Sequence, residues 1–147
     1  MGWDIVTGPD AGAWTAAQIG TAFLPSAETC IGLTRHGEFV AGVIYEDWNG
    51  KSIVAHIAIT RCITPAYLAA IFDYPFNVCG AHKIICPVCS DNPRAIKLVS
   101  NMGFAIEAAL KDAAPTGDIL IFTLTKADCR FLKEHHGKEK ASAAACA

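Results

Sequence analysis

The chain shows two kinds of hydrophobic pattern, one with the spacing of strands and one with the spacing of helices. Three strand-like runs rich in β-branched and aromatic residues follow one another in the first half, and two more pair near the end. The pair Asn49-Gly50 separates the second run from the third and is typical of a tight hairpin turn. The pattern therefore predicts an antiparallel meander. The expected strands cover residues 3–7, 29–35, 39–48, 52–60, 83–89, 105–111 and 119–125.

Three further segments combine helical spacing with start or stop signals. Thr64-Pro65 fits a helix start, because threonine can cap free amides and proline suits the first turn. Asn92-Pro93 opens another helix, and Gly103 closes it because glycine adopts the left-handed conformation. The expected helices cover residues 11–23, 66–76 and 94–102, with a short helix over 126–135.

The predicted order is β-α-βββ-α-β-α-ββ, in one domain over residues 1–136 with a disordered tail over 137–147. The run from Lys83 to Cys89 is almost unbroken in its apolar character, as in a strand buried on both faces. It follows the third meander strand after a helix, and such a crossover implies a parallel pair. The fold class is therefore α/β (α+β), with a mixed, mostly antiparallel sheet.

Composition narrows the class of function. The chain has 147 residues, is 52% apolar and carries a formal net charge of −2. It lacks the basic field that holds a nucleic-acid backbone, which disfavours a nucleic-acid binder but leaves open an enzyme that modifies a base. No apolar run is long enough to span a bilayer, and no export signal is seen. We therefore expect a cytoplasmic protein whose seven cysteines are reduced thiols.

The segment Asn92-Pro93-Arg94-Ala95, followed by Asn101-Met102-Gly103-Phe104, resembles the GNAT acyltransferases. Members of that superfamily commonly open this helix with Asn-x-x-Ala and close it with Gly-Phe. The resemblance extends to about Leu132. It implies helices on both faces of the sheet, a splay between the two parallel strands, and acetyl-CoA as co-substrate. Pro87 fits this picture, because a proline at the splay costs no ladder bond.

The resemblance also implies cofactor-binding positions. The superfamily binds the acetyl-CoA pyrophosphate on a loop that reads Gln/Arg-x-x-Gly-x-Gly/Ala, and residues 61–66 stand at the equivalent place. Thr64 replaces the central glycine and Pro65 removes one N–H donor, so the loop is altered. The pantetheine would lie along the preceding strand. The implied cofactor-binding residues are Ile57, Ala58, Ile59, Thr60, Arg61, Thr64, Ala66 and Asn92.

Acetyl transfer to an amine needs a base for the acceptor and a proton for the leaving thiolate. Glu46 and His56 on the meander strands are the candidate bases, although a strand histidine and a carboxylate near a turn are more often structural. Many GNAT enzymes place an acidic tyrosine where this chain has Val99. Tyr74, Ser90 or a water would have to act instead, unless no acid is needed.

Cysteine chemistry offers weaker alternatives. Cys79, His82, Cys86 and Cys89 are zinc-ligand types. If residues 83–89 form a strand, however, Cys86 and Cys89 point to opposite faces and cannot share an ion. The same geometry argues against a redox pair, and no spacing supports a nucleophilic cysteine. We therefore expect no metal site.

The sequence thus predicts an acetyl-CoA-dependent N-acyltransferase that acts on an unidentified amine, a nucleobase or protein amine among the options. The altered loop and Val99 support an alternative, a binding or regulatory protein that keeps the fold without the chemistry. A homodimer is left open. Stretches at 72–76, 116–118 and 128–132 also resemble short GNAT-type proteins of phages and prophages.

Overall fold

The computed structural model describes residues 2–132 and 145–146, and its main feature is one seven-stranded sheet. The strands lie in the order β1-β2-β3-β4-β6-β8-β7, with three helices packed around them. The element order predicted from the sequence is confirmed, and two short strands, β5 and β9, are additional. The strands are β1 (Trp3–Thr7), β2 (Thr29–Arg35), β3 (Glu38–Glu46), β4 (Ser52–Ile59), β5 (Cys62–Ile63), β6 (Lys83–Cys89), β7 (Ala105–Ala114), β8 (Gly117–Thr125) and β9 (Ala145–Cys146). The helices are α1 (Pro9–Ile19), α2 (Pro65–Asp73) and α3 (Pro93–Asn101).

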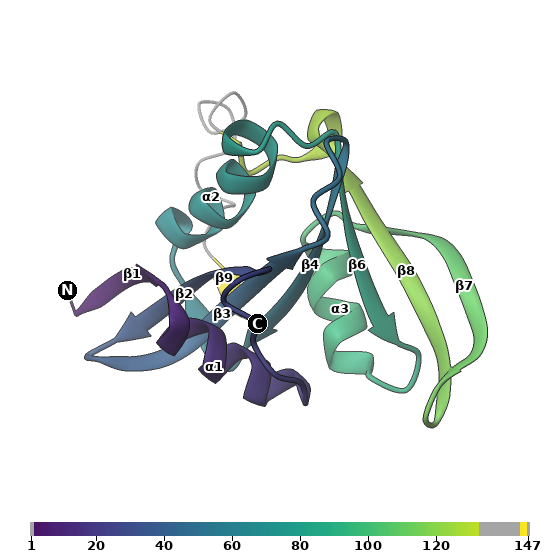
Figure 1. Ribbon diagram of the computed structural model, residues 1–147, viewed down its shortest axis with the longest axis horizontal. Coiled ribbons are helices and arrows are strands. Elements are labelled where there is room, and N and C mark those ends of the chain that lie inside the picture. Colours follow the sequence, from purple (N-terminus) through teal and green to yellow (C-terminus); the bar gives the residue numbers. More distant parts are fainter. Residues whose placement is uncertain (1, 133–144, 147) are drawn as a thin grey trace.

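The sheet opens between β4 and β6, its parallel pair. Pairing starts at Ser52 with Lys83 and ends at Val54 with Ile85. Beyond that point the strands diverge, so that the sheet forms a V in Figure 1. Pro87 lies in the diverging part and pairs with Ile121 of β8 but has no partner on β4. The predicted splay is therefore confirmed, and it explains how a proline is tolerated inside the sheet.

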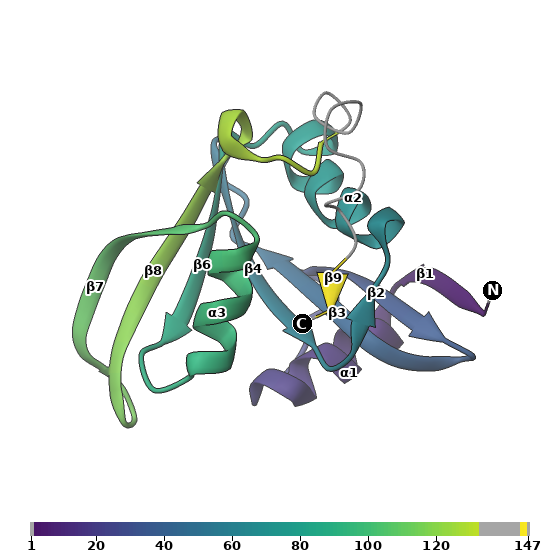
Figure 2. The ribbon, with the colours of Figure 1, turned by 180° about the vertical axis from the view of Figure 1, so that it is seen from behind.

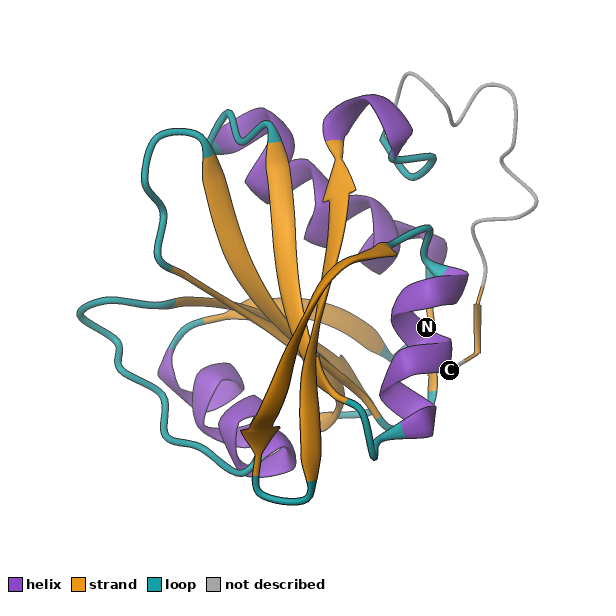
Figure 3. Cartoon of the chain, turned by 90° about the vertical axis from the view of Figure 1, so that its right-hand side faces the viewer, coloured by secondary structure: helices purple, strands orange, loops and turns teal. Residues whose placement is uncertain are grey.

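Helices cover both faces of the sheet, as the side view shows (Figure 3). On one face α1 packs on β2 and β3, where Ala11 and Ala16 join Cys30 and Ile44 in a small core. This approach is close enough to require a glycine on β3. A Cβ at Gly42 would lie 1.7 Å from the Oγ1 of Thr15.

The larger core fills the opposite face, beneath α2 and α3. Its largest fully buried side chains include Tyr67, Phe72 and Phe122. The buried hydroxyl of Tyr67 is satisfied, because it donates a 2.8 Å hydrogen bond to the carbonyl of Ile31. This bond fixes the start of α2 against β2, and so holds in place the chain that follows β4.

Several element ends differ from the predicted ones, for local reasons. α1 ends at Ile19, four residues early, because Gly20 takes a left-handed conformation (φ 79°) and donates its N–H to the carbonyl of Ala16. β3 ends at Glu46 because Asp47 has a positive φ of 56°. α2 continues as one π-helical turn over Tyr74–Val78. The expected helix over 126–135 is a 3-10 turn at Lys126–Asp128, and residues 133–135 lie outside the described part.

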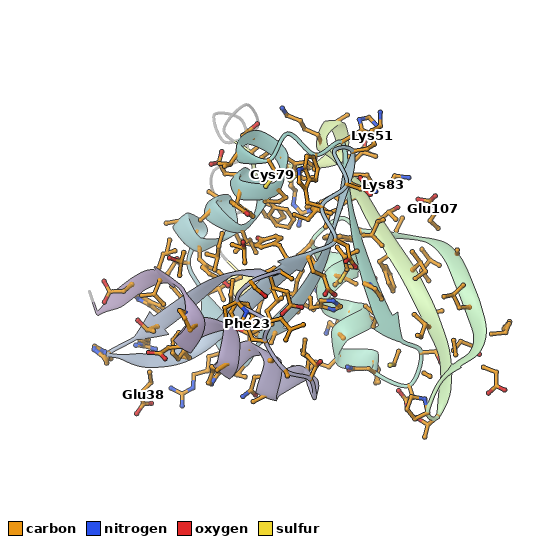
Figure 4. The ribbon with its side chains drawn as sticks, in the orientation of Figure 1. Phe23, Glu38, Lys51, Cys79, Lys83 and Glu107 are labelled. Carbon is orange, nitrogen blue, oxygen red and sulfur yellow. The ribbon has the colours of Figure 1, made fainter. Side chains whose placement is uncertain are left out.

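The β7–β8 hairpin is longer than predicted, and its turn contacts the loop before α3. Ser90 and Asp118 exchange two hydrogen bonds, each 2.9 Å long. The hydroxyl of Thr116 also donates to the carboxylate of Asp91. At the other end of the hairpin, Lys83 and Glu107 form a 2.9 Å ion pair (Figure 4). Residues 116–118 therefore brace the loop that leads into α3.

The two unpredicted strands pair with each other, with Cys62 opposite Cys146 (Figure 2). Apart from β9, the predicted tail lies outside the described residues. Cys30, Cys79, Cys86 and Cys89 carry free thiols. Cys62 is disulfide-bonded, which corrects the expectation that every thiol is reduced. The chain between 132 and 145 carries no pattern that would have predicted this pairing.

Candidate active site

A cavity of about 420 Å³ fills the opening between β4 and β6. Its floor comes from β6 and its walls come from β3 and β4 on one side and α3 on the other, with the end of α1 at one rim. The lining residues are Gln18, Ile19, Thr21, Glu28, Ile44, Glu46, His56, Ile57, Cys86, Pro87, Val88, Cys89, Asn92, Ala95, Leu98 and Val99.

Both predicted base candidates line this cavity and contact each other. The Nε2 of His56 lies 2.5 Å from the Oε2 of Glu46, and the two side chains are 27% and 28% exposed. The hairpin register brings them together, because Glu46 pairs with Val54, two residues before His56 on the same face of β4. A carboxylate hydrogen-bonded to an imidazole can accept a proton from a group in the cavity.

A second carboxyl group, that of Glu28, lies beside this pair. Burial disfavours the charged form of Glu46, yet hydrogen bonds with His56 and Glu28 and the charge of His56 lower its pKa below the usual value. Glu28 is itself oriented by the N–H of Leu24, which donates to its Oε1 over 2.7 Å. Glu46 is therefore ionised over the range in which most enzymes work.

The backbone edge predicted to hold pantetheine is exposed to the cleft in part. Residues 57–59 lie beyond the last β4–β6 pair, so β6 leaves this edge of β4 unpaired. Ile57 lines the cavity, whereas Ala58 and Ile59 bury their side chains. The carbonyl of Ile59 accepts a 3.1 Å hydrogen bond from the Nη2 of Arg94. Thr60 is tied to Val40 through its N–H and its hydroxyl.

The predicted pyrophosphate loop lies outside the cavity lining and has few donors. Thr64 caps α2, accepting a 3.1 Å hydrogen bond from the N–H of Tyr67 on its hydroxyl oxygen. Pro65 occupies the first position of the helix and has no N–H. Arg61 and Ala66 are exposed beside it. The resemblance placed a phosphate here, and the described residues of the loop offer it Arg61, the Thr64 hydroxyl and the Ala66 amide.

Asn92 and Val99 lie on the α3 wall. The Oδ1 of Asn92 caps α3 by accepting a 3.1 Å hydrogen bond from the N–H of Ala95, and its amide nitrogen remains for a ligand. Val99 lines the cavity where a tyrosine acid is common in the superfamily. Tyr74 packs on Tyr45 instead, and Ser90 bonds Asp118, so neither substitute acid lines the cavity.

The cysteines form no metal-binding cluster in the part of the chain that the structure describes. The predicted strand over 83–89 is confirmed, and Cys86 is buried while Cys89 is exposed. Within residues 2–132 and 145–146, no group of three His, Cys, Asp or Glu residues is placed to hold a metal ion. Across the same residues, no helix has the length and apolar character to cross a membrane.

Sequence reasoning missed two contributors to the site. Glu28 reaches the cavity from the loop after α1, and no local pattern links that loop to β3. Arg94 belongs to the Asn-Pro-Arg-Ala segment, whose pattern indicates a helix opening and no ligand contact for the arginine. Its place in the first turn of α3, beside the splay, was the signal that could have revealed it.

Comparisons with known proteins agree with this architecture. No protein-family model and no curated protein matches the sequence. Among solved structures, a chimera of the spermidine N-acetyltransferase SpeG from Vibrio cholerae and hSSAT is similar, with a TM-score of 0.59 and 20% identity over 69% of this chain and 70% of that one. The N-acetyltransferase PseH from Campylobacter jejuni, solved in complex with acetyl coenzyme A, has a TM-score of 0.55 and 15% identity over 69% and 70% of the two chains. At these identities the likeness shows the fold alone: the chain has the GNAT N-acetyltransferase fold.

Proposed function

We propose that this chain is an acetyl-CoA-dependent N-acetyltransferase whose active site is the cavity between β4 and β6. The observation that carries the proposal is the Glu46–His56 pair, held at 2.5 Å inside a cavity at the splay of this fold. The neighbouring folds include N-acetyltransferases, one of them in complex with acetyl coenzyme A. The unpaired edge of β4 at residues 57–59 supports a place for pantetheine.

In acetyl transfer these residues would accept one proton, the one that the acceptor amine loses. The amine nitrogen attacks the thioester carbonyl carbon, a C–N bond forms and the C–S bond breaks. The Glu46–His56 pair takes the proton that the attacking nitrogen loses. The pair is suited to this role because Glu46 is ionised and both side chains line the cavity.

The leaving thiolate has to gain a proton, or leave as an anion. Val99 cannot supply one, and none of the described residues that line the cavity is a tyrosine. Because Glu46 and His56 are more than a quarter exposed, water reaches the site and can protonate the thiolate. Solvent therefore protonates the thiolate, and no residue of the cavity acts as the general acid.

Charge suggests which amines to test first. Glu28 and Glu46 both line the cavity near the end of α1, and the ionised carboxylate of Glu46 favours an acceptor that arrives as a cation. Spermidine, named for the SpeG neighbours, is a reasonable first acceptor. Nucleobase and protein amines, a cytoplasmic location, a homodimer and the resemblance to phage proteins stay predictions from the sequence.

Two observations favour a second candidate, a binding or regulatory protein that retains the fold. The loop at 61–66 has lost the central glycine and one amide, and Val99 replaces the usual acid. Such a protein would bind a ligand in the cavity without turnover. Binding of acetyl-CoA that is never followed by acetyl transfer to any amine would select this candidate.

The test is an acetyl-transfer screen with a variant that fills the cavity. The purified chain is incubated with acetyl-CoA and a panel of polyamines, amino sugars, nucleosides and lysine peptides, and products are detected by mass spectrometry. Ala95→Trp should abolish any transfer, because Ala95 lines the cavity. Lys97→Trp is the matched control, since Lys97 is exposed on the same helix and does not line the cavity. Equal transfer by both variants would place the reaction elsewhere.

A further inference from the structure

The donor set of the loop at 61–66 is poor for a diphosphate. The N–H of Tyr67 is used by the Thr64 hydroxyl, and the N–H of Leu68 bonds the Thr64 carbonyl. Pro65 has no N–H, so Ala66 supplies the free amide of the first turn of α2. A diphosphate held by so few amides needs cationic side chains close by.

Arg94 is a cation placed opposite this loop, on the other wall of the splay. It is exposed in the first turn of α3, and its Nη2 spans the cleft to the Ile59 carbonyl at 3.1 Å. Ile59 ends β4, and only Thr60 separates it from the loop. No carboxylate within the described residues forms a salt bridge with Arg94. A guanidinium has five N–H donors, so one bond to a carbonyl leaves most of them for a ligand.

The bond to Ile59 also has a consequence for ligand entry. The Ile59 carbonyl belongs to the β4 edge that β6 leaves unpaired, which the proposed function assigns to pantetheine. An arriving pantetheine amide and the Arg94 guanidinium therefore compete for the same acceptor. A phosphate oxygen is a stronger partner for a guanidinium than a neutral carbonyl, so a ligand that brings both groups resolves the competition.

We propose that Arg94 binds the diphosphate of coenzyme A, leaving the Ile59 carbonyl as the ligand enters and replacing donors that the altered loop lacks. This inference rests on the proposed function. It assigns the main phosphate contact to α3 instead of the α2 loop, and it makes the free protein a form in which Arg94 bridges the mouth of the cleft. Ligands without the diphosphate must displace Arg94 without the compensating ion pair.

The experiment is calorimetric titration of the full chain with coenzyme A and, separately, with pantetheine, which has the same thiol arm without phosphates. Arg94→Ala should weaken coenzyme A binding about tenfold or more, because a charge-assisted contact is lost. The same variant should bind pantetheine as well as the wild type does, or more tightly, because the Ile59 carbonyl is no longer occupied.

Two further variants keep the test sharp. Arg94→Gln retains a donor for the Ile59 carbonyl but removes the charge, so it guards against an alanine variant that folds poorly. It should also bind coenzyme A about tenfold or more weakly than the wild type does. Arg130→Ala is the matched control, because Arg130 also donates to a backbone carbonyl, that of Asn101 at the far end of α3. It should bind coenzyme A normally.

The outcomes separate the two proposals. If the wild type binds neither coenzyme A nor acetyl-CoA, the proposed function fails and this inference fails with it. If the wild type binds coenzyme A and both Arg94 variants bind it equally well, only the role of Arg94 is overturned. A parallel loss for pantetheine and coenzyme A would also overturn it, since the diphosphate would then not be what Arg94 recognises.

Discussion

Replacing Glu46 with glutamine tests the proposed base most specifically. Glutamine keeps the shape of the side chain and can still hydrogen-bond His56, but it cannot take a proton at neutral pH. The 2.5 Å pair is more than a quarter exposed, so it should stabilise the fold by no more than about 1 kcal/mol. A positioned base contributes roughly 100-fold or more to a rate, which at 100-fold is about 2.7 kcal/mol in the activation barrier.

We therefore expect Glu46→Gln to lower kcat/KM about 100-fold while it changes the unfolding temperature little. The assay follows release of the coenzyme A thiol in the presence of the best amine from the screen. Glu38→Gln is the matched control, because Glu38 is exposed at the opposite end of the same strand (Figure 4). If Glu46→Gln retained the activity of this control, the carboxylate would not be the base and the reasoning would be refuted.

Three other outcomes follow from the structure. Burial raises the pKa of the Cys86 thiol to about 12, so iodoacetamide at pH 8 should label the exposed Cys89 in the native protein and leave Cys86 unlabelled; peptide mapping that finds equal labelling would contradict this. Tyr67→Phe should cost about 1–2 kcal/mol in denaturant unfolding, because the buried Ile31 carbonyl loses its donor; an unchanged midpoint would argue against that bond. The folded-state pKa of Glu46 is lowered from 4.5, so its contribution to stability is present above that value and is lost as the pH falls through the folded pKa. Glu46→Gln should accordingly flatten the acid limb of the stability profile, and identical limbs in the two proteins would count against the Glu46–His56 interaction.

Much of the fold was predictable because its signals are local. Asn92 and Gly103 mark the ends of α3, and both helix signals hold in the structure. Pro87 was the most informative single residue, because a proline inside an apolar strand requires a missing partner. The observed pairing of β4 with β6 stops before it.

The site was less predictable, because it depends on strand register. A two-residue turn at Asn49-Gly50 would pair Trp48 with Lys51, and so Glu46 with residue 53. That register would put Glu46 and His56 on opposite faces of the sheet. In the structure the pairing is shifted by one residue, so that Glu46 pairs with Val54. The side chains of Glu46 and His56 therefore lie on the same face and line the cavity.

Two long-range contacts lay beyond any local pattern. Glu28 approaches Glu46 because the loop after α1 carries it there. That loop begins early because α1 ends before Gly20, and the apolar spacing does not indicate this helix end. The reach of Arg94 to Ile59 joins residues 35 positions apart across the splay. Helical spacing predicts which face of α3 is apolar. It does not predict which group the end of an exposed side chain contacts.

The central claim is that the opening between β4 and β6 binds acetyl-CoA. Calorimetric titration of the purified wild-type chain with acetyl-CoA, beside the cavity-filling Ala95→Trp variant, tests it most directly. The account predicts saturable binding of one acetyl-CoA per chain by the wild type and none by the variant. Absence of binding by the wild type at millimolar acetyl-CoA, or equal binding by both proteins, would contradict it.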